Sequence, residues 1–275
     1  MDTFALFKLK GKVAVITGGA GLLGEKHADV VAEAGGVPVL WDINPDTLQS
    51  AVDDLAEKQG VQACNMVVDI TDPESIKAGL SSILAEHKKV DILINNAAND
   101  PKVNTDEKIS WSRLENFDLA MWKKDIAVGL TGAYLCSQII GTHMADKAGG
   151  VILNIASDLG VIAPDQRIYR KPGIEDHLQP VKPVTYSVVK HGIIGLTKYL
   201  ATYWAEKNIR VNAISPGGIF NQQPDDFMNK LTNLIPLGRM ADKDEYKAAI
   251  LFLVSEASSY MTGANLIIDG GRTCW

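Results

Sequence analysis

The sequence predicts an α/β protein in which one doubly wound parallel sheet carries helices on both faces. Short apolar runs alternate along the 275-residue chain with segments of helical periodicity. The runs are apolar throughout rather than at every second residue, as is typical of strands buried on both faces of a parallel sheet. No change of composition, internal repeat or linker divides the chain, so a single dinucleotide-binding domain over residues 1–275 is expected.

The expected elements alternate from the N-terminus onward. Gly35 and Gly36 end the first helix, and Pro45 suits the first turn of the second. In such a fold, ligands bind at the carboxyl ends of the strands. The expected strands are 13–17, 37–41, 61–68, 90–97, 149–157, 209–214 and 264–268, and the expected helices are 22–34, 45–59, 73–88, 111–145 and 184–207.

The composition is that of an ordinary globular protein, with 46% hydrophobic and 22% charged residues. A net charge of −6 argues against a nucleic-acid partner, and no apolar run is long enough to span a bilayer. The N-terminus lacks a signal-peptide pattern. Cys64, Cys136 and Cys274 lack the spacing of metal ligands. We therefore expect a cytoplasmic protein with a small-molecule substrate, no membrane or nucleic-acid partner and no metal.

A glycine-rich stretch, TGGAGLLG at 17–24, joins the first strand to the first helix. Gly18 permits the sharp turn, Gly21 lets the backbone approach a pyrophosphate, and Gly24 lets the helix pack closely on the sheet. Backbone N–H groups at the start of the helix, at Leu22 and Leu23, then face the phosphates. The stretch predicts a dinucleotide site without deciding the chemistry.

Asp42 supports this interpretation. It ends the second strand about 20 residues beyond the glycines, where a carboxylate can hold the adenosine-ribose hydroxyls. The alternative is a surface residue that caps the helix at Pro45. A carboxylate repels a 2′-phosphate, and no Arg or Lys accompanies it in the loop or at Ile43 and Asn44, so NAD is favoured over NADP.

The chain resembles the short-chain dehydrogenase/reductases along nearly its whole length, in the glycine-rich stretch and in six further motifs. The ordered set of motifs is specific, although each motif alone is not. The motifs are TGGAGLLG (17–24), VVDITD (67–72), NNAA (95–98), ILNIASD (152–158), YSVVK (186–190), IRVNAISPGGI (209–219) and MTGANLIIDGG (261–271).

The resemblance implies a Rossmann-type fold and a nicotinamide cofactor. It also assigns cofactor contacts that would otherwise read as strand caps and turns. These are Asp69 and Ile70 beside the adenine, Asn95 and Asn96 at the centre, and Pro216, Gly217 and Ile219 beside the nicotinamide.

Hydride transfer between NAD and an alcohol needs a proton acceptor at the substrate oxygen. Tyr186 and Lys190 lie four residues apart and share one face of a helix, where the ammonium favours the phenolate. In the family, the lysine also holds the nicotinamide ribose and a serine, here Ser157, hydrogen-bonds the reacting oxygen. We expect Tyr186 to be the acid/base, with Ser157 and Lys190 as its partners, and the resemblance implies that Tyr186 and Lys190 also contact the cofactor.

Two other tyrosines compete for this role. Tyr203 and Lys207 repeat the spacing at the far end of the same helix, where a surface pair is expected. Tyr169 is closer in sequence to Ser157, but Gly173 stands where its lysine would be.

Four departures from the family pattern stand out. Ser157 and Tyr186 are further apart than usual, so 164–182 is expected to be an insertion near the active site. Gly129 replaces an asparagine that relays protons in many relatives, and water at its backbone is one substitute. Asn221 replaces a threonine that often touches the nicotinamide amide. Leu22 takes the place of a glycine, which gives the loop the spacing of the extended, epimerase-type branch.

The insertion, PDQRIYRKPGIEDHLQPVK, reads either as a solvated loop or as a substrate lid for an anionic target such as a sugar phosphate. For the lid, Arg167, Tyr169 and Arg170 are candidate substrate contacts, together with Asp158 after Ser157. The run SDLGVIAPDQRIY is also loosely similar to oxidoreductases of bacterial surface-sugar and flagellin-glycan synthesis.

The expected function is therefore NAD-dependent hydride transfer on a secondary alcohol or ketone, in carbohydrate metabolism. A sugar-nucleotide epimerase or dehydratase with recycled NAD, and a non-catalytic NAD-binding regulator, remain as alternatives. The helical stretches 127–140 and 187–203 are apolar on more than one face, so a homo-oligomer (dimer or tetramer) is expected.

Overall fold

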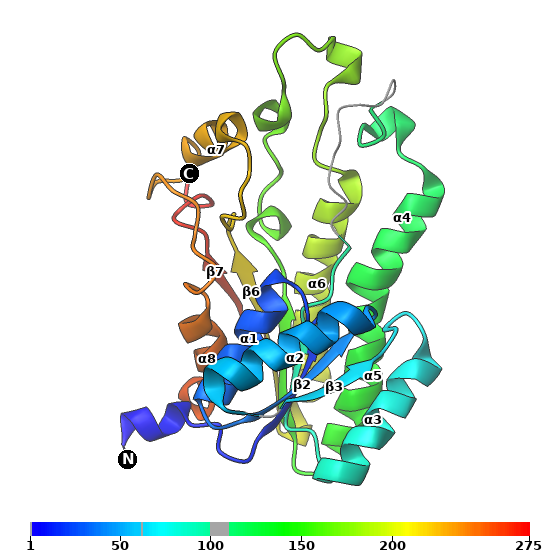
Figure 1. Ribbon diagram of the computed structural model, residues 1–275, viewed down its shortest axis with the longest axis vertical. Coiled ribbons are helices and arrows are strands. Elements are labelled where there is room, and N and C mark those ends of the chain that lie inside the picture. Colours follow the sequence, from blue (N-terminus) through cyan, green and yellow to red (C-terminus); the bar gives the residue numbers. More distant parts are fainter. Residues whose placement is uncertain (1, 62, 100–109) are drawn as a thin grey trace.

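The structure, a computed structural model, describes residues 2–61, 63–99 and 110–275. Over these residues, seven strands form one parallel sheet in the order β3-β2-β1-β4-β5-β6-β7, which confirms the predicted fold class (Figure 1). The strands are β1 (Val13–Thr17), β2 (Val37–Asp42), β3 (Cys64–Val67), β4 (Ile92–Asn95), β5 (Gly150–Ile155), β6 (Ile209–Pro216) and β7 (Asn265–Ile268).

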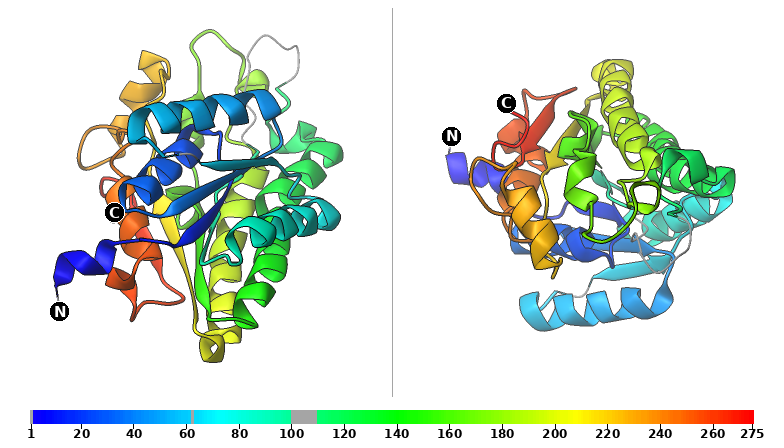
Figure 2. Two further views of the ribbon diagram at one scale, coloured as in Figure 1. Left: turned by 60° about the horizontal axis from the view of Figure 1, so that its bottom comes forward. Right: turned by 90° about the horizontal axis from the view of Figure 1, so that it is seen from above.

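Helices cover both faces of the sheet (Figure 2). One face packs against α1 (Leu22–Glu33), α2 (Pro45–Gln59) and α8 (Lys247–Val254). The other packs against α3 (Pro73–His87), α5 (Gly132–Ala145) and α6 (Val184–Tyr203). Because the central strands are apolar on both sides, each face has its own hydrophobic core. The remaining helices are α4 (Leu119–Ile126), which packs on α6, and α7 (Asp225–Thr232).

Local sequence fixes the starts of two helices. The Asn44 side chain accepts from the backbone N–H groups of Asp46 and Thr47 at the start of α2. Asp72 accepts from Glu74 N at the start of α3. Proline follows each cap, where its missing N–H costs nothing and its fixed φ suits the helix.

Some element boundaries differ from the expectation. The stretch 111–145 begins with a 3₁₀ turn (Leu114–Asn116), and a π-helical turn (Ala127–Thr131) separates α4 from α5. The sequence did not predict α7 and α8, each of eight residues, because two turns are too short for a clear helical period. Further single turns lie at Thr3–Phe7, Asp158–Gly160, Gln166–Tyr169, Asp176–Leu178, Ala205–Lys207 and Glu256–Ser258.

The neighbours β1 and β4 mark the point where the strand order reverses, because the chain passes from β1 outward to β3 before returning to β4. Such a point leaves a crevice at the carboxyl ends of the strands. The segment 164–182 projects beyond that edge, at the top of Figure 1. In the part of the chain that the structure describes, no helix has both the length and the apolar character needed to span a lipid bilayer.

Candidate active site

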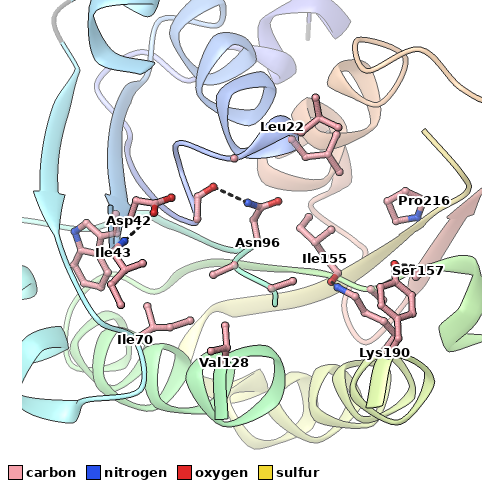
Figure 3. Close-up of a pocket in the computed structure, with 18 of the residues that line it drawn as sticks. Leu22, Asp42, Ile43, Ile70, Asn96, Val128, Ile155, Ser157, Lys190 and Pro216 are labelled. Carbon is pink, nitrogen blue, oxygen red and sulfur yellow. Dashed lines mark hydrogen bonds between the residues drawn. The ribbon is translucent and has the colours of Figure 1, made fainter. Parts of the chain in front are cut away.

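A cavity of about 470 Å³ opens at the carboxyl edge of the sheet, around the switch point (Figure 3). Its walls come from the turn after β1 and from the ends of β2, β4, β5 and β6, and the start of α6 closes one side. Most of the residues expected from the sequence line it. These are Gly18, Gly21, Leu22, Leu23, Asp42, Asp69, Ile70, Asn96, Ser157, Tyr186, Lys190, Pro216, Gly217 and Ile219.

The glycine turn has the shape of a cradle for a phosphate. Gly18 has a φ of +62°, in the region that glycine favours, and a Cβ at Gly24 would lie 2.1 Å from Gly18 O. Gly24 therefore lies beneath the turn and lets α1 start directly behind it. Gly21, whose Cβ would meet only Gly18 O at 3.3 Å, lies on the cavity side. The shape of the turn is suited to binding the phosphates of the dinucleotide that the sequence leads us to expect.

Asp42 stands at the opposite end of the cavity from Lys190 (Figure 3). Its carboxylate accepts from Ala20 N at 3.2 Å, in the glycine turn, and from Ile43 N at 2.8 Å. The side chain of Asn44, not that of Asp42, caps α2. Lys190 is the only cationic side chain among the described residues that line the cavity. Among the lining residues that the structure describes, the Asp42 end thus presents a carboxylate without a cation.

The side chain of Asn96 fixes the glycine turn through hydrogen bonds to its backbone. Its Nδ2 donates to Thr17 O and Gly18 O, each at 3.0 Å. Thr17 Oγ1 in turn accepts from the backbone N–H groups of Asn96 and Ala97. Behind this junction, burial lowers the pKa of His27 to about 4, against a smaller opposing effect of a hydrogen bond to Asn96.

Asn95 lies behind the wall of the cavity rather than on it. Its buried Nδ2 donates to Ser137 Oγ at 2.9 Å and to Asn154 Oδ1 at 2.8 Å, which ties β4 to α5 and β5. We did not expect several apolar lining residues, because next to strand ends they read as ordinary core. These are Trp41, Ile43, Val68, Ala97, Ala98, Val128, Ile155 and Ala156, with Thr71 as a polar addition.

The side chains of Ser157, Tyr186 and Lys190 lie together at one end of the cavity. Tyr186, in the first turn of α6, donates from its hydroxyl to Ser157 Oγ at 3.4 Å. Lys190 lies one turn later on the same helix face, and its Nζ donates to Ile155 O at 2.8 Å. Lys182, at the end of the insertion, lies with Nζ 3.7 Å from the centroid of the Tyr186 ring. Lys190 Nζ is 5.9 Å from the same centroid, so a phenol that can exchange a proton lies beside a hydroxyl and near two cations.

Asp158 sits beneath this group rather than facing the cavity. It accepts from Ser157 Oγ at 2.8 Å, and its second oxygen lies 2.7 Å from Arg272 Nη1. The substrate role expected for Asp158 has no support here, because both of its oxygens are engaged in the protein interior.

Comparison with known proteins agrees with this geometry. A model described as short chain dehydrogenase matches residues 12–169, and one described as enoyl-(acyl carrier protein) reductase matches 176–273. The chain belongs to the short-chain dehydrogenase family. It is accordingly an oxidoreductase that transfers hydride between a nicotinamide cofactor and an alcohol or ketone.

Relatives within the family include enzymes named for polyols. The chain is 31% identical to a D-threitol dehydrogenase from Mycolicibacterium smegmatis over 97% of this chain and 95% of the relative. It is 37% identical to an NAD-dependent glycerol dehydrogenase from Listeria innocua over 97% and 96%. A gluconate 5-dehydrogenase structure from Burkholderia cenocepacia, in complex with NADP and tartrate, superposes with a TM-score of 0.85 at 26% identity and full coverage of both chains.

The family position that is Gly129 here has no room for an asparagine. It lies in the π-helical turn, and a Cβ would meet Val189 Cγ1 at 2.6 Å. One turn earlier, buried Asp125 accepts from Asn99 Nδ2 at 2.6 Å and from Thr185 Oγ1. These polar groups line a small cavity of about 10 Å³ that also reaches Tyr186 and Lys190. That space is about one water molecule in size.

The insertion of this short-chain dehydrogenase is anchored rather than free. Ile168 is buried against Leu231 and Met240, and the Tyr169 ring packs on Phe227 of α7. The Gln179 side chain accepts from Lys171 N and donates to Lys171 O and Ile174 O, which closes the outer turn.

The expected substrate contacts of the insertion lie away from the cavity. Arg167 is 82% exposed and bound to Asp165, whose pKa its guanidinium lowers to about 2. Arg170 is exposed, and neither it nor Tyr169 lines the cavity. Asn221 is likewise exposed and outside the cavity lining.

Proposed function

We propose that this short-chain dehydrogenase oxidises a polyol or reduces the corresponding sugar ketone, with NAD as its cofactor and Tyr186 as the acid/base. The observation that carries the proposal is the meeting of Tyr186, Ser157 and Lys190 at one end of the cavity. The polyol class is supported by the names of the D-threitol and glycerol dehydrogenases, which match this chain along nearly their whole length.

The residues of the chain divide the work along the cavity. The glycine turn would hold the phosphates, Asp42 the adenosine ribose, and Pro216 and Gly217 the nicotinamide end. When bound, the nicotinamide supplies the hydride acceptor or donor. Ser157 would hydrogen-bond the substrate oxygen while Tyr186 takes its proton, and the nearby Lys190 ammonium favours the phenolate that receives it.

Tyr186→Phe tests the acid/base assignment. The variant keeps the ring and removes the hydroxyl, so kcat is expected to fall by about 10²–10⁴-fold while NAD binding stays unchanged. A panel of polyols, followed through NADH absorbance, first identifies a substrate. Tyr260→Phe is the matched control, because that ring is fully exposed and does not line the cavity. Equal turnover in Tyr186→Phe and wild type would refute the assignment, and product formed without net NADH would favour the epimerase class.

The NAD preference is supported by the carboxylate at the Asp42 end of the cavity. Because hydrogen bonds to a charged group contribute about 1.5–3 kcal/mol, Asp42→Ala is expected to weaken NAD binding by roughly 10–100-fold. NADP binding should stay equal or improve, since a like charge is removed. Asp46→Ala, at an exposed position in the first turn of α2, is the control. Tighter binding of NADP than NAD by the wild type would contradict the preference.

We also propose a single-domain homo-oligomer. Tyr134 on α5 and Val188, Tyr199 and Tyr203 on α6 are exposed, which supports helix pairing between subunits. A monomer in light scattering would refute the oligomer. A reducing, cytoplasmic location is supported by the unpaired state of the three cysteines, all of which lie in the described residues.

A further inference from the structure

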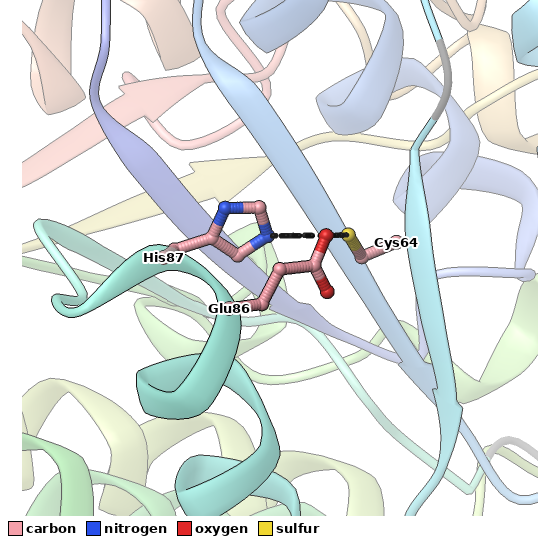
Figure 4. Close-up of side chains that lie close together, drawn as sticks. All are labelled: Cys64, Glu86 and His87. Carbon is pink, nitrogen blue, oxygen red and sulfur yellow. Dashed lines mark hydrogen bonds and ion pairs between the residues drawn. The ribbon is translucent and has the colours of Figure 1, made fainter.

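We propose that Cys64, Glu86 and His87 form a binding site for a divalent cation of the zinc type. The three residues lie where the first residue of β3 meets the last two residues of α3, and their side chains converge (Figure 4). Spacing along the chain gives no hint of the cluster, because Cys64 and Glu86 are 22 residues apart. The proposal does not depend on the proposed function.

The ligand atoms already have the separations of a coordination shell. Cys64 Sγ lies 3.2 Å from His87 Nε2 and 3.5 Å from Glu86 Oε1, and the last two atoms are 3.6 Å apart. Ligands about 2.0–2.3 Å from a tetrahedral zinc ion stand roughly 3.3–3.7 Å from one another. A cation can therefore enter the triangle with little movement of the backbone.

The donor set favours a thiophilic cation over magnesium or calcium. Sulfur and imidazole nitrogen are ligands that zinc prefers, whereas magnesium and calcium prefer oxygen alone. When a cation binds, the Cys64 thiol releases its proton to solvent, and the thiolate and the Glu86 carboxylate together then bring two negative charges, which match a divalent cation. The site also lies at the carbonyl end of α3, the negative end of the helix dipole.

The ammonium group of the neighbouring Lys88 does not occupy the space between the three ligand atoms. Lys88, which follows the helix in a left-handed conformation, donates from Nζ to Ala85 O. Glu86 is 62% exposed and His87 only 19%, so the site is open to solvent on the glutamate side. We infer that water completes the coordination there.

The site is distinct from the active site. Cys64 is at the amino end of β3, whereas the large cavity opens at the carboxyl end, beyond Val68. None of the three residues lines that cavity. Since β3 is at the edge of the sheet, a bound cation would tie the edge strand to the helix that covers it and stabilise this corner of the fold.

Zinc titration of the metal-free protein tests the proposal. After treatment with a chelator and desalting, wild-type protein in competition with a chromogenic zinc chelator is expected to bind one equivalent of Zn²⁺ per chain. Its melting temperature should rise with added Zn²⁺, because the ion binds the native state. Cys64→Ser and His87→Gln should each weaken binding by at least about tenfold, since losing even an outer-shell partner has that effect.

Two control variants make the same kinds of substitution outside the proposed zinc site. Cys274→Ser removes an exposed cysteine elsewhere, and His191→Gln an exposed histidine on α6, so both should bind Zn²⁺ as the wild type does. Substitution with Co²⁺ gives a second readout, a thiolate-to-cobalt absorption band that Cys64→Ser should lack.

Two results of the zinc titration would count against the proposed site. Absence of saturable Zn²⁺ binding by the wild type, or equal binding by Cys64→Ser, His87→Gln and the wild type, would overturn the proposal. Should Cys64→Ser fail to fold, the cobalt spectra of the wild type and His87→Gln decide: the same band in both would overturn it, and a weakened band in His87→Gln would support it.

Discussion

Arg272 and Asp158 form an ion pair in the protein interior, with 2.7 Å between Nη1 and Oδ2 and more than nine-tenths of each side chain buried. Arg272 belongs to the segment after β7, whereas Asp158 follows the last residues of β5. Since the other Asp158 oxygen accepts from Ser157 Oγ, the pair links the C-terminal segment to the hydroxyl beside Tyr186. We therefore expect Arg272 to act as a positioning residue for the active site, through Asp158.

Arg272→Met is expected to impair both stability and catalysis. Removing one partner leaves a buried carboxylate uncompensated, which typically costs about 3–5 kcal/mol in the free energy of unfolding. Without Arg272, Asp158 is no longer held in place as the acceptor of the Ser157 hydroxyl. We therefore expect kcat to fall by up to about 100-fold, while the affinity for NAD is retained. Denaturant titration and steady-state kinetics measure the two effects.

A double variant and a surface control sharpen this prediction. Arg272→Met with Asp158→Asn removes the stranded charge and should regain part of the stability without regaining kcat. Arg239→Met breaks the exposed pair with Glu245 and should leave the free energy of unfolding close to that of the wild type, because water screens surface pairs. A wild-type kcat in Arg272→Met would rule out the positioning role.

Asp125 is expected to assist proton movement near Lys190. It lies in the small cavity that adjoins Gly129, where Val189 leaves no room for a longer side chain. Asp125→Asn keeps the size but removes the charge, so kcat should fall by about tenfold or more, and its pH profile should shift. Asp146→Asn, at an exposed position after α5, is the matched control. An unchanged pH profile in Asp125→Asn would leave only a structural role for this residue.

His27 is expected to destabilise the protein in mild acid. Its pKa is about 4 in the native state because it is buried, whereas a histidine in the unfolded chain titrates near 6.5. Between these values the unfolded state binds a proton that the native state does not, so stability falls as the pH drops from about 6.5 towards about 4. At about pH 5 this group alone should cost roughly 2 kcal/mol relative to neutral pH.

His27→Leu tests this. Denaturant titrations at about pH 7.5 and pH 5 should show that the variant loses roughly 2 kcal/mol less than the wild type over this interval. His191→Gln, which changes an exposed histidine, should behave as the wild type. An identical loss in His27→Leu and the wild type would contradict the native-state pKa.

The sequence by itself determined the sheet, its parallel strands and most of the cavity. Buried strands leave an apolar run, and glycines such as Gly18 and Gly24 stand where no side chain fits, so these features are readable locally. Residues next to the ends of parallel strands, such as Asp42 and Asn96, meet at one edge of the sheet by topology alone, which made them predictable.

Only the tertiary structure decided what depends on partners distant in sequence. Asp158 read as a substrate contact because nothing near it reveals Arg272, which is 114 residues away. Arg167 and Tyr169 read as lid residues, but Asp165 binds one and Phe227 packs on the other. The cluster of Cys64, Glu86 and His87 likewise exists only because β3 packs beside α3. Charge and packing act through space, so the sequence names such groups, and the fold decides which of them meet.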